Sequence, residues 1–387
     1  MGRHFAANGM TLLIVVMILA FGVISWGRGA YVAPGPMGST TCVQVLPGST
    51  MNRVSEQLQA QGVISSATVF RIGANYTERS DQLKAGSFIV PDGSSMDEIT
   101  DIITRGGQST CGTEIVYRIG VRDVSVQVRE FDAEAGGYVE QVSFLAGEPV
   151  PAAYREARDL ADVRYRVVVA EGGTTQDTAA ALLAADFLEG TIGELPAEGM
   201  LAPDSYEVVF GSDRSALIER MRSAQEARIA DAWSARSADL PFDTPTELLT
   251  LASIIEKETG VAEERRVVSA VFVNRMRRGM RLQTDPTIIY GITRGAGLLD
   301  RPIRRSDIDG VTEQRTHGAV EYNTYQIDGL PPGPIANPGI AALQAAADPD
   351  STPYIFFVAD GTGGHAFAET LEEHNRNVAA FRALDSE

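Results

Sequence analysis

The chain has 387 residues, 44% of them hydrophobic and 22% charged, a composition that excludes wholesale disorder and allows two or three domains. Its 51 acidic and 33 basic side chains give a net charge of −18, which argues against a nucleic-acid partner because a phosphate backbone needs clustered cations. Two cysteines and four scattered histidines exclude a zinc cluster, and the P-loop, serine-hydrolase and His-Glu-x-x-His motifs do not occur. We therefore expect neither a metal nor an organic cofactor.

An apolar segment lies close to the N-terminus. Residues 5–27 contain no Asp, Glu, Lys or Arg, and a helix that crosses the hydrocarbon core of a bilayer needs about 20 such residues. The segment predicts a short tail over residues 1–9 and a transmembrane helix over residues 10–27. A cleaved signal peptide is the alternative, although its apolar core usually spans only about 7 to 15 residues. Arg3 and Arg28 balance each other across the segment, so charge alone leaves its orientation open.

A short soluble unit follows a Gly/Pro-rich stretch. We interpret residues 28–40 as a linker that holds the soluble part away from the membrane. Residues 43–50 then predict a valine-rich strand, a glycine turn and a helix-capping threonine. The same pattern recurs at residues 167–174, either as a duplicated strand–turn–helix unit or by chance.

The two cysteines both lie after the apolar segment. In an oxidising compartment Cys42 and Cys111 could form one disulfide, and we hypothesise that they do. Two buried free thiols are the alternative. Between Cys111 and residue 165, two segments alternate like strands (115–119 and 124–128), but no chemistry is evident, and we interpret residues 113–165 as an inserted subdomain.

The most informative helix begins at Thr244, a plausible N-cap whose capping box Glu247 completes, and it ends at Gly260. On a helical wheel its leucines, isoleucines and Ala252 fill one broad sector. Thr250, Ser253 and Lys257 fall outside this sector, whereas Glu256 and Glu258 fall inside it.

A glutamate on a buried face is costly unless it is paired or protonated. Burial raises the pKa of a carboxyl group, and a raised pKa suits a general acid near neutral pH. Glu256 is therefore a candidate catalytic residue. The alternative is a buried ion pair with Arg265 or Arg266, because structural pairs also perturb carboxylates.

Residues 251–259 (LASIIEKET) resemble the catalytic helix of the YceG-like endolytic murein transglycosylases. The resemblance covers about residues 166–380 and departs from the family pattern over residues 293–321. Residues 114–163 have no recognisable counterpart, and the N-terminal unit is only loosely similar to a LysM domain. The blocks that match in order are EGMLAPDSY at 198–206, VFVNR at 271–275, MRLQTDPT at 280–287, YNTY at 322–325, GLPPGPI at 329–335 and HAF at 365–367.

This resemblance implies an α+β fold with one N-terminal transmembrane helix. The soluble part would comprise a LysM-like α/β subdomain (41–112), the inserted subdomain (113–165) and a larger α+β catalytic domain (166–387). The family is anchored in the cytoplasmic (inner) membrane with its enzyme domain outside the cytoplasm, which implies a cytoplasmic tail over residues 1–9 and a periplasmic C-terminal domain. Candidate protein partners are peptidoglycan synthases and division proteins.

The resemblance also implies lytic cleavage of the β-1,4 bond between N-acetylmuramic acid and N-acetylglucosamine within peptidoglycan strands. The product would be a 1,6-anhydromuramyl end. One carboxyl group suffices for this reaction, and Glu256 occupies the family's catalytic position. The six residues expected to bind substrate are Gln283, Asp285, Tyr322, Asn323, Thr324 and Tyr325. The three residues expected to support the site are Glu258, Asn274 and His365.

Simpler interpretations remain open for several of these positions. Asp285 precedes Pro286 and could serve only to start a helix. Residues 322–325 could form an ordinary polar turn, and His365 could be purely structural. Two competing functions are a non-catalytic glycan-binding scaffold and a muramidase that uses water. The second requires a partner carboxylate about 5 to 9.5 Å from the acid.

Overall fold

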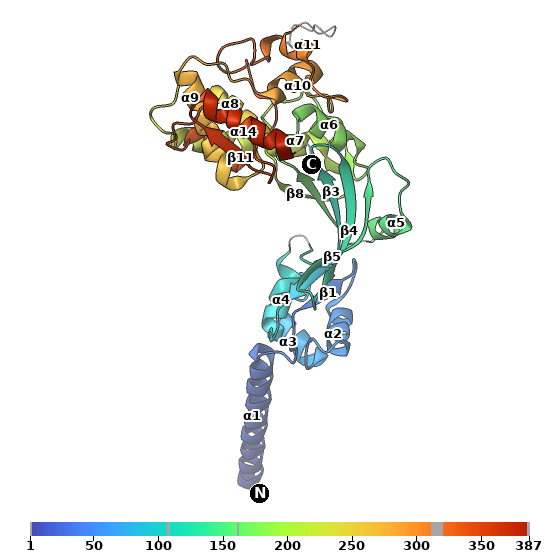
Figure 1. The fold of residues 1–387 in the computed structure, drawn as a ribbon. Coiled ribbons are helices and arrows are strands. Elements are labelled where there is room, and N and C mark those ends of the chain that lie inside the picture. The colour runs from blue at the N-terminus through green and yellow to red at the C-terminus, as the bar shows by residue number, and fades with distance from the viewer. Residues whose placement is uncertain (1, 107–108, 161, 311–319, 385–387) are drawn as a thin grey trace. The chain divides into compact units, whose positions relative to one another are not determined.

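The computed structural model describes residues 2–106, 109–160, 162–310 and 320–384 (Figure 1). The chain divides into two compact units. The N-terminal unit comprises Met1–Val116 and Val126–Tyr165, and the C-terminal unit comprises Tyr117–Ser125 and Arg166–Glu387. Helices and strands occur in both units, which confirms the predicted α+β class.

The first helix, α1 (Gly2–Val32), contains the apolar segment. Its part Met10–Val32 spans 23 residues and contains an unburied stretch with a mean hydropathy of 2.4, so by length and composition it could cross a membrane. The helix continues past the predicted end at residue 27. It ends shortly before Pro34, consistent with the bias of a residue preceding proline against helical geometry.

The expected linker over residues 28–40 is therefore not a free spacer. Its first five residues are helical, and Tyr31 is buried among side chains of the N-terminal unit. The hydroxyl of Tyr31 donates to Oγ1 of Thr100 over 2.9 Å. The apolar helix is consequently attached directly to the folded unit that follows it.

The N-terminal unit surrounds one apolar core that includes Val43, Leu58 and Phe70. Strands β1 and β2 pair antiparallel, with Val43 opposite Phe88. The elements of this core are β1 (Thr41–Val45), α2 (Met51–Ala60), α3 (Ala67–Tyr76), β2 (Gly86–Val90) and α4 (Met96–Arg105).

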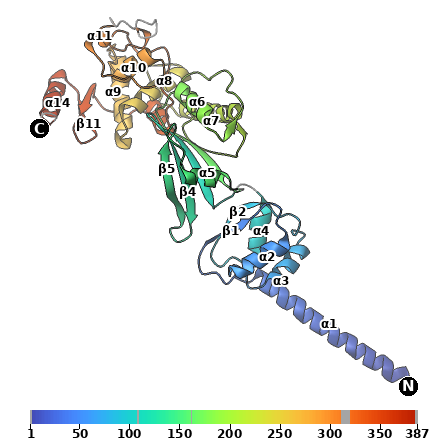
Figure 2. The same ribbon diagram turned by 90° about the vertical axis from the view of Figure 1, so that its right-hand side faces the viewer.

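A five-stranded sheet has the order β5-β4-β3-β6-β8, and its neighbouring strands β4 and β5 are visible in Figure 2. The boundary between the two units crosses β3, β4 and β6. This division does not set residues 113–165, expected as an inserted subdomain, apart as a unit of their own, because the three strands belong to both units. The elements are β3 (Thr113–Ile119), β4 (Val124–Asp132), β5 (Gly137–Leu145), α5 (Ala152–Arg158), β6 (Arg164–Val169) and β8 (Ser205–Val208).

The core of the C-terminal unit is built around α8 (Pro245–Glu258), which contacts α7, α9, α10 and α13. The repeated strand–turn–helix pattern is confirmed, because Thr50 caps α2 and Thr174 caps α6. The other elements of this unit are α6 (Thr175–Ala184), β7 (Leu188–Glu189), β9 (Ser212–Asp213), α7 (Arg214–Ser234), η1 (Ala262–Glu264), α9 (Arg265–Arg277), α10 (Asp285–Thr293), α11 (Arg305–Ile308), α13 (Ile340–Ala347), β10 (Phe356–Ala359), β11 (His365–Ala368) and α14 (Leu371–Leu384).

The capping box of α8 is confirmed, since Thr244 and Glu247 exchange hydrogen bonds. The wheel is wrong for Thr250 and Ser253, which are buried although they fall outside the apolar sector. Burial is tolerated because both hydroxyl groups have partners. Oγ1 of Thr250 donates to the carbonyl of Thr246 over 2.8 Å, and Oγ of Ser253 donates to the carbonyl of Thr250 over 2.7 Å.

The structure joins Cys42 and Cys111 by a disulfide, with their Cα atoms 5.9 Å apart and a sequence separation of 69. Closing such a loop restricts the unfolded chain and contributes about 4 kcal/mol on the chain-entropy model. We expect the double variant Cys42→Ser/Cys111→Ser to lower the free energy of unfolding of the N-terminal unit by about that amount. Thiol titration of the denatured, unreduced protein should find no free thiol, and two free thiols would contradict the bridge.

Candidate functional site

The candidate site lies along the last two turns of α8, which carry Glu256, Lys257 and Glu258. The preceding residues, from Leu248 to Ile255, are all buried. The end of α8 is therefore held in a fixed place by core packing. Glu256 is partly buried there, whereas Lys257 is more exposed and donates from Nζ to the carbonyl of Gly172 over 3.1 Å.

Burial raises the pKa of Glu256 above its ordinary value of 4.5. A backbone hydrogen bond from Gly339 to Oε2, 2.9 Å long, opposes this effect, and the negative charge of Glu171 adds to it. Within the described residues Oε1 has no hydrogen-bond partner. The side chain thus has one oxygen held in position and one available to carry a proton.

The described residues do not form the buried ion pair that was the alternative interpretation of Glu256. Arg266 pairs with Asp348 at 2.9 Å instead. The charge of Arg265 lowers the pKa of Glu256, but this effect is weaker than that of burial. No ion pair joins the two side chains within the described residues. Glu256 is therefore not neutralised by a guanidinium group.

A second carboxylate, from Glu171, lies on the other side of Gly339. A Cβ atom added at Gly339 would collide with the Glu171 carboxyl group, while the amide of Gly339 contacts Glu256. Since both carboxyl groups contact one residue, their nearest oxygens are at most about 7 Å apart. The sequence prediction of a single carboxylate at this position is therefore incomplete.

Asn337 fixes the two loops that surround Glu256. Its side chain is buried, and its Oδ1 accepts from the amide of Leu201 over 2.9 Å and from Oγ1 of Thr175 over 3.3 Å. Its Nδ2 donates to the carbonyl of Gly173 over 3.1 Å. The loop that ends in Gly339 is thereby tied to the Gly172–Gly173 turn that follows Glu171.

A groove of about 750 Å³ runs beside the end of α8. Glu256 itself does not line this groove, but two of its neighbours do. Lys257 is adjacent in sequence, and a Cβ atom added at Gly172 would lie 3.6 Å from Cγ of Glu256. The residues along the groove's length include Thr174, Asp177, Asp285, Ile289, Tyr290 and Leu298.

Glu258 is buried more deeply than Glu256, and burial raises its pKa. It accepts a hydrogen bond from Oγ1 of Thr284, at the start of α10. The amide of Thr284 in turn donates to Oγ1 of Thr324 over 3.0 Å. Glu258 thus links the end of α8 to the loop over residues 322–325.

Asp285 and Tyr325 form a pair at the edge of the groove. The hydroxyl of Tyr325 donates to Oδ1 of Asp285 over 2.8 Å, and burial raises the pKa of Tyr325. Asp285 does not cap α10, because the cap position is Thr284 and no side-chain cap bond forms there. Gln283, two residues earlier, is exposed and has a positive φ of 50°. Asp285 and Gln283 are therefore both accessible to a ligand.

Asn323 and Thr324 do not line the groove, although the family resemblance implies that they bind substrate. Both are buried. Nδ2 of Asn323 donates to the carbonyls of Asp307 and Ile308, and Oγ1 of Thr324 contacts Oγ1 of Thr287 at 2.9 Å. Their polar groups are used inside the fold, so these residues shape the loop.

Tyr322 does not line the groove but packs against a residue that does. Its ring is buried, and its centre lies 5.0 Å from that of Tyr290, which lines the groove. The guanidinium of Arg294 covers the Tyr322 ring at 5.2 Å from the centroid. Tyr322 therefore supports the groove wall through Tyr290.

Asn274 and His365 each connect two elements of the C-terminal unit. Nδ2 of Asn274 donates to the carbonyls of Thr352 and Tyr354, which fastens α9 to the segment before β10. Nδ1 of His365 lies 2.7 Å from Oε2 of Glu264, which fastens β11 to η1. The charge of His365 also lowers the pKa of Glu258. The supporting role expected of these two residues stays a prediction.

Sequence analysis missed Glu171, Asn337 and Gly339. Glu171 sits within the strand–turn–helix pattern of residues 167–174, where only the turn and cap were considered. Asn337 and Gly339 flank a proline in an apparently ordinary turn. The signal available was a polar residue within two positions of a glycine in each of two turns.

Comparison with known proteins gives one family. The model of the YceG-like family matches residues 43–380. An endolytic murein transglycosylase of Bacillus subtilis is 26% identical over 348 residues, covering 87% of this chain and 84% of the relative. A protein of the same name from Streptococcus pneumoniae is 25% identical over 343 residues, covering 87% of this chain. The matched region is 57% of the length of that streptococcal relative.

Among solved structures, a YceG-like protein of Listeria monocytogenes is similar. The identity is 23% and the TM-score 0.46, with coverage of 87% of this chain and 98% of the other.

We expect Asn337→Ala to destabilise the C-terminal unit by at least about 2 kcal/mol, because each buried group left unpaired costs about 1 to 3 kcal/mol. Thermal unfolding of the intact protein in detergent should show a lower midpoint. The control is Asn375→Ala on an exposed position of α14, for which a change within about 0.5 kcal/mol is expected. Equal midpoints for both variants would contradict the role assigned to Asn337.

Proposed function

The chain belongs to the YceG-like family, and we propose that it is an endolytic murein transglycosylase. Its reaction would cleave the β-1,4 bond between N-acetylmuramic acid and N-acetylglucosamine within glycan strands, leaving 1,6-anhydromuramyl ends. The observation that carries this proposal is the environment of Glu256, a carboxyl group with a raised pKa beside a groove of about 750 Å³. The printed names of the bacillary and streptococcal relatives agree with it.

The mechanism needs one proton-transfer group. Protonated Glu256 donates its proton to the glycosidic oxygen as the bond to C1 of the muramyl residue breaks. The 6-hydroxyl of the same residue then attacks C1 and gives its proton to the Glu256 carboxylate. No water is consumed, and the enzyme returns to its starting protonation state. The amide of Gly339 holds Oε2 throughout, which leaves Oε1 for the transferred proton.

The neighbours of the acid have separate roles in this proposal. Asp285 and Gln283 are exposed and offer a carboxylate and an amide to sugar groups. Tyr325 orients Asp285 through its hydroxyl group. Lys257 and Tyr290 line the groove, with Tyr322 packed behind Tyr290.

A hydrolytic reaction is the second candidate, and Glu171 is the observation that favours it. The bound of about 7 Å between the nearest oxygens of Glu171 and Glu256 falls within the range that glycoside hydrolases use. In that reaction Glu171 would act as the base or nucleophile, and water would supply the new hydroxyl group. In the lyase reaction Glu171 only raises the pKa of Glu256.

For cellular location, we propose that α1 crosses the cytoplasmic membrane once and that the C-terminal unit faces the periplasm. Support comes from the length and apolar character of Met10–Val32 and from the disulfide between Cys42 and Cys111, which suits an oxidising compartment. Cleavage near the membrane would let the enzyme end the growth of nascent strands, with peptidoglycan synthases or division proteins as partners. Glycan binding by the N-terminal unit, which we compare with a LysM domain, belongs to the same proposal.

Glu256→Gln should reduce turnover of purified glycan strands by about 10²- to 10⁴-fold, because an amide cannot transfer the proton. Mass spectrometry of products formed in ¹⁸O-labelled water distinguishes the candidates for the wild-type enzyme. Anhydro ends without label support the lyase, and labelled reducing ends support the hydrolase. The control is Glu247→Gln, the same change at the capped start of α8, where glutamine also completes a capping box. Wild-type activity of Glu256→Gln would refute the assignment.

Glu171→Gln should move the pH profile of kcat/KM. Removing the negative charge lowers the pKa of Glu256, and the proposed acid works only while protonated. Activity is lost as pH rises through that pKa, so the basic limb of the profile should shift to lower pH. The maximal rate should change little. Loss of activity at every pH would instead identify Glu171 as a direct participant and favour the hydrolase.

A further inference from the structure

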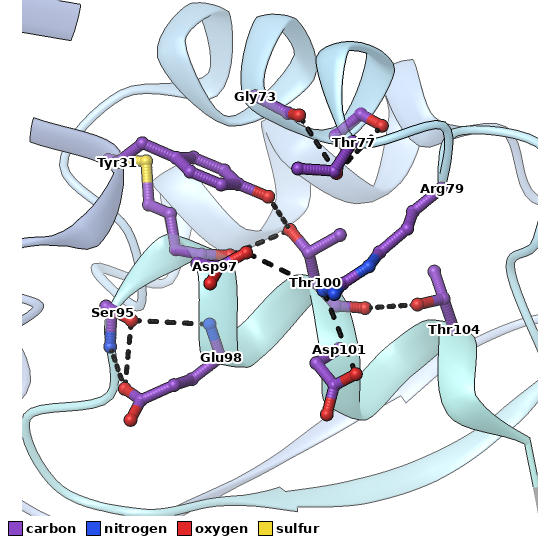
Figure 3. A network of polar contacts seen from close by, with 12 residues as sticks. Tyr31, Gly73, Thr77, Arg79, Ser95, Asp97, Glu98, Thr100, Asp101 and Thr104 are labelled. Atoms are coloured by element: carbon purple, nitrogen blue, oxygen red, sulfur yellow. Dashed lines mark hydrogen bonds and ion pairs between the residues drawn. The ribbon is translucent and has the colours of Figure 1, made fainter. Parts of the chain in front are cut away.

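The end of α1 is fixed to the N-terminal unit by Tyr31 (Figure 3). Its hydroxyl donates to Oγ1 of Thr100 on α4, and its ring covers Gly73 on α3, where an added Cβ atom would collide with it. The chain beyond the helix is also held, since the amide of Gly35 donates to the carbonyl of Gly93 over 3.1 Å. The helix therefore enters the folded unit without a flexible joint.

This attachment fixes the level of α3 relative to a bilayer that α1 would cross. A helix rises about 1.5 Å per residue, and the hydrocarbon core is about 30 Å thick, so about 20 residues suffice to cross it. The candidate span starts at Met10, and the charged Arg28 sets its far limit, so the helix leaves the core close to residue 28. Tyr31, which is buried in the protein, then lies at the level of the lipid headgroups. Because Tyr31 contacts Gly73, the second half of α3 lies at the same level.

The exposed face of α3 carries large apolar side chains. Between residues 41 and 106, the large hydrophobic side chains that are exposed are Leu46 at 44%, Ile72 at 65% and Tyr76 at 87%. Ile72 and Tyr76 are four residues apart on α3, so they share one face of the helix. They flank Gly73, the residue that Tyr31 covers.

We propose that Ile72 and Tyr76 dock into the interfacial layer of the bilayer that α1 spans. A phospholipid surface fits these side chains, because an aliphatic group can enter the acyl boundary while a tyrosine keeps its hydroxyl among the headgroups. A second copy of the chain fits less well. A stable protein interface buries about 1,200 Å² or more, and an aromatic side chain supplies only about 150 to 250 Å².

Docking at α3 would give the N-terminal unit two attachments to the membrane, the helix α1 and this face. The inference rests on the proposed membrane crossing but not on the proposed enzymatic reaction. Two independent observations support it. Tyr31 contacts Gly73, which sets the level of α3 relative to the bilayer, and Tyr76 is exposed on that helix.

The experiment uses the full chain in phospholipid nanodiscs with single introduced cysteines. Because Cys42 and Cys111 are joined to each other, a fluorophore such as NBD should label only the new thiol. The test variants are Ile72→Cys and Tyr76→Cys, and the matched control is Leu145→Cys, an apolar side chain 44% exposed on β5. Val16→Cys, within the apolar segment of α1, reports on the membrane crossing itself. Lipids with a spin label near the headgroup or deep in the acyl chain serve as quenchers.

The proposal expects a blue-shifted emission and quenching by the shallow spin label at positions 72 and 76, with neither change at position 145. Water-exposed emission at 72 and 76 would overturn it. A blue shift that lipid spin labels do not quench would show that another protein surface covers the face, which also overturns it. If position 16 is not quenched by the deep label, the membrane crossing fails, and the docking proposal fails with it, whatever the enzymatic activity.

Discussion

The arrangement at the candidate site depends on one constraint, the placement of a carboxyl group at the end of a helix that is buried on all sides. The side chains from Leu248 to Ile255 are buried, so α8 cannot rotate to move Glu256 into bulk water. Desolvation then raises the pKa of Glu256, and the single bond from the Gly339 amide orients it without neutralising it. Asn337 keeps the Gly339 loop in place from behind.

Local signals in the sequence predicted the part of the site that one helix contains. The Thr244–Glu247 capping box set the start of α8, and the apolar pattern placed Glu256 and Glu258 on its buried face. Glu171 and Asn337 could not be found in this way, because they come from loops far apart in sequence that meet only in the fold. The wheel also failed at Ser253, since it cannot show that the amide of Ile335 reaches that hydroxyl group from a distant loop.

Burial explains the remaining differences. A motif of tyrosine, asparagine and threonine suggests sugar binding, but Asn323 and Thr324 bond to the chain itself and are enclosed. The Gly/Pro content after residue 28 suggests a spacer, but one tyrosine, Tyr31, packs into the next unit and removes the freedom that composition implies. In both cases long-range contacts override what the local composition suggests, and sequence patterns do not show such contacts.

The central claim is that Glu256 binds its proton more tightly than an ordinary glutamate. The most direct test is a ¹³C NMR titration of the protein with labelled glutamate side chains, in which the resonance absent from Glu256→Gln identifies the group. The account predicts a pKa for Glu256 above the ordinary 4.5. A value at or below 4.5 would contradict it, because a carboxyl group that ionises as readily as one in water has no protonated form to donate at neutral pH.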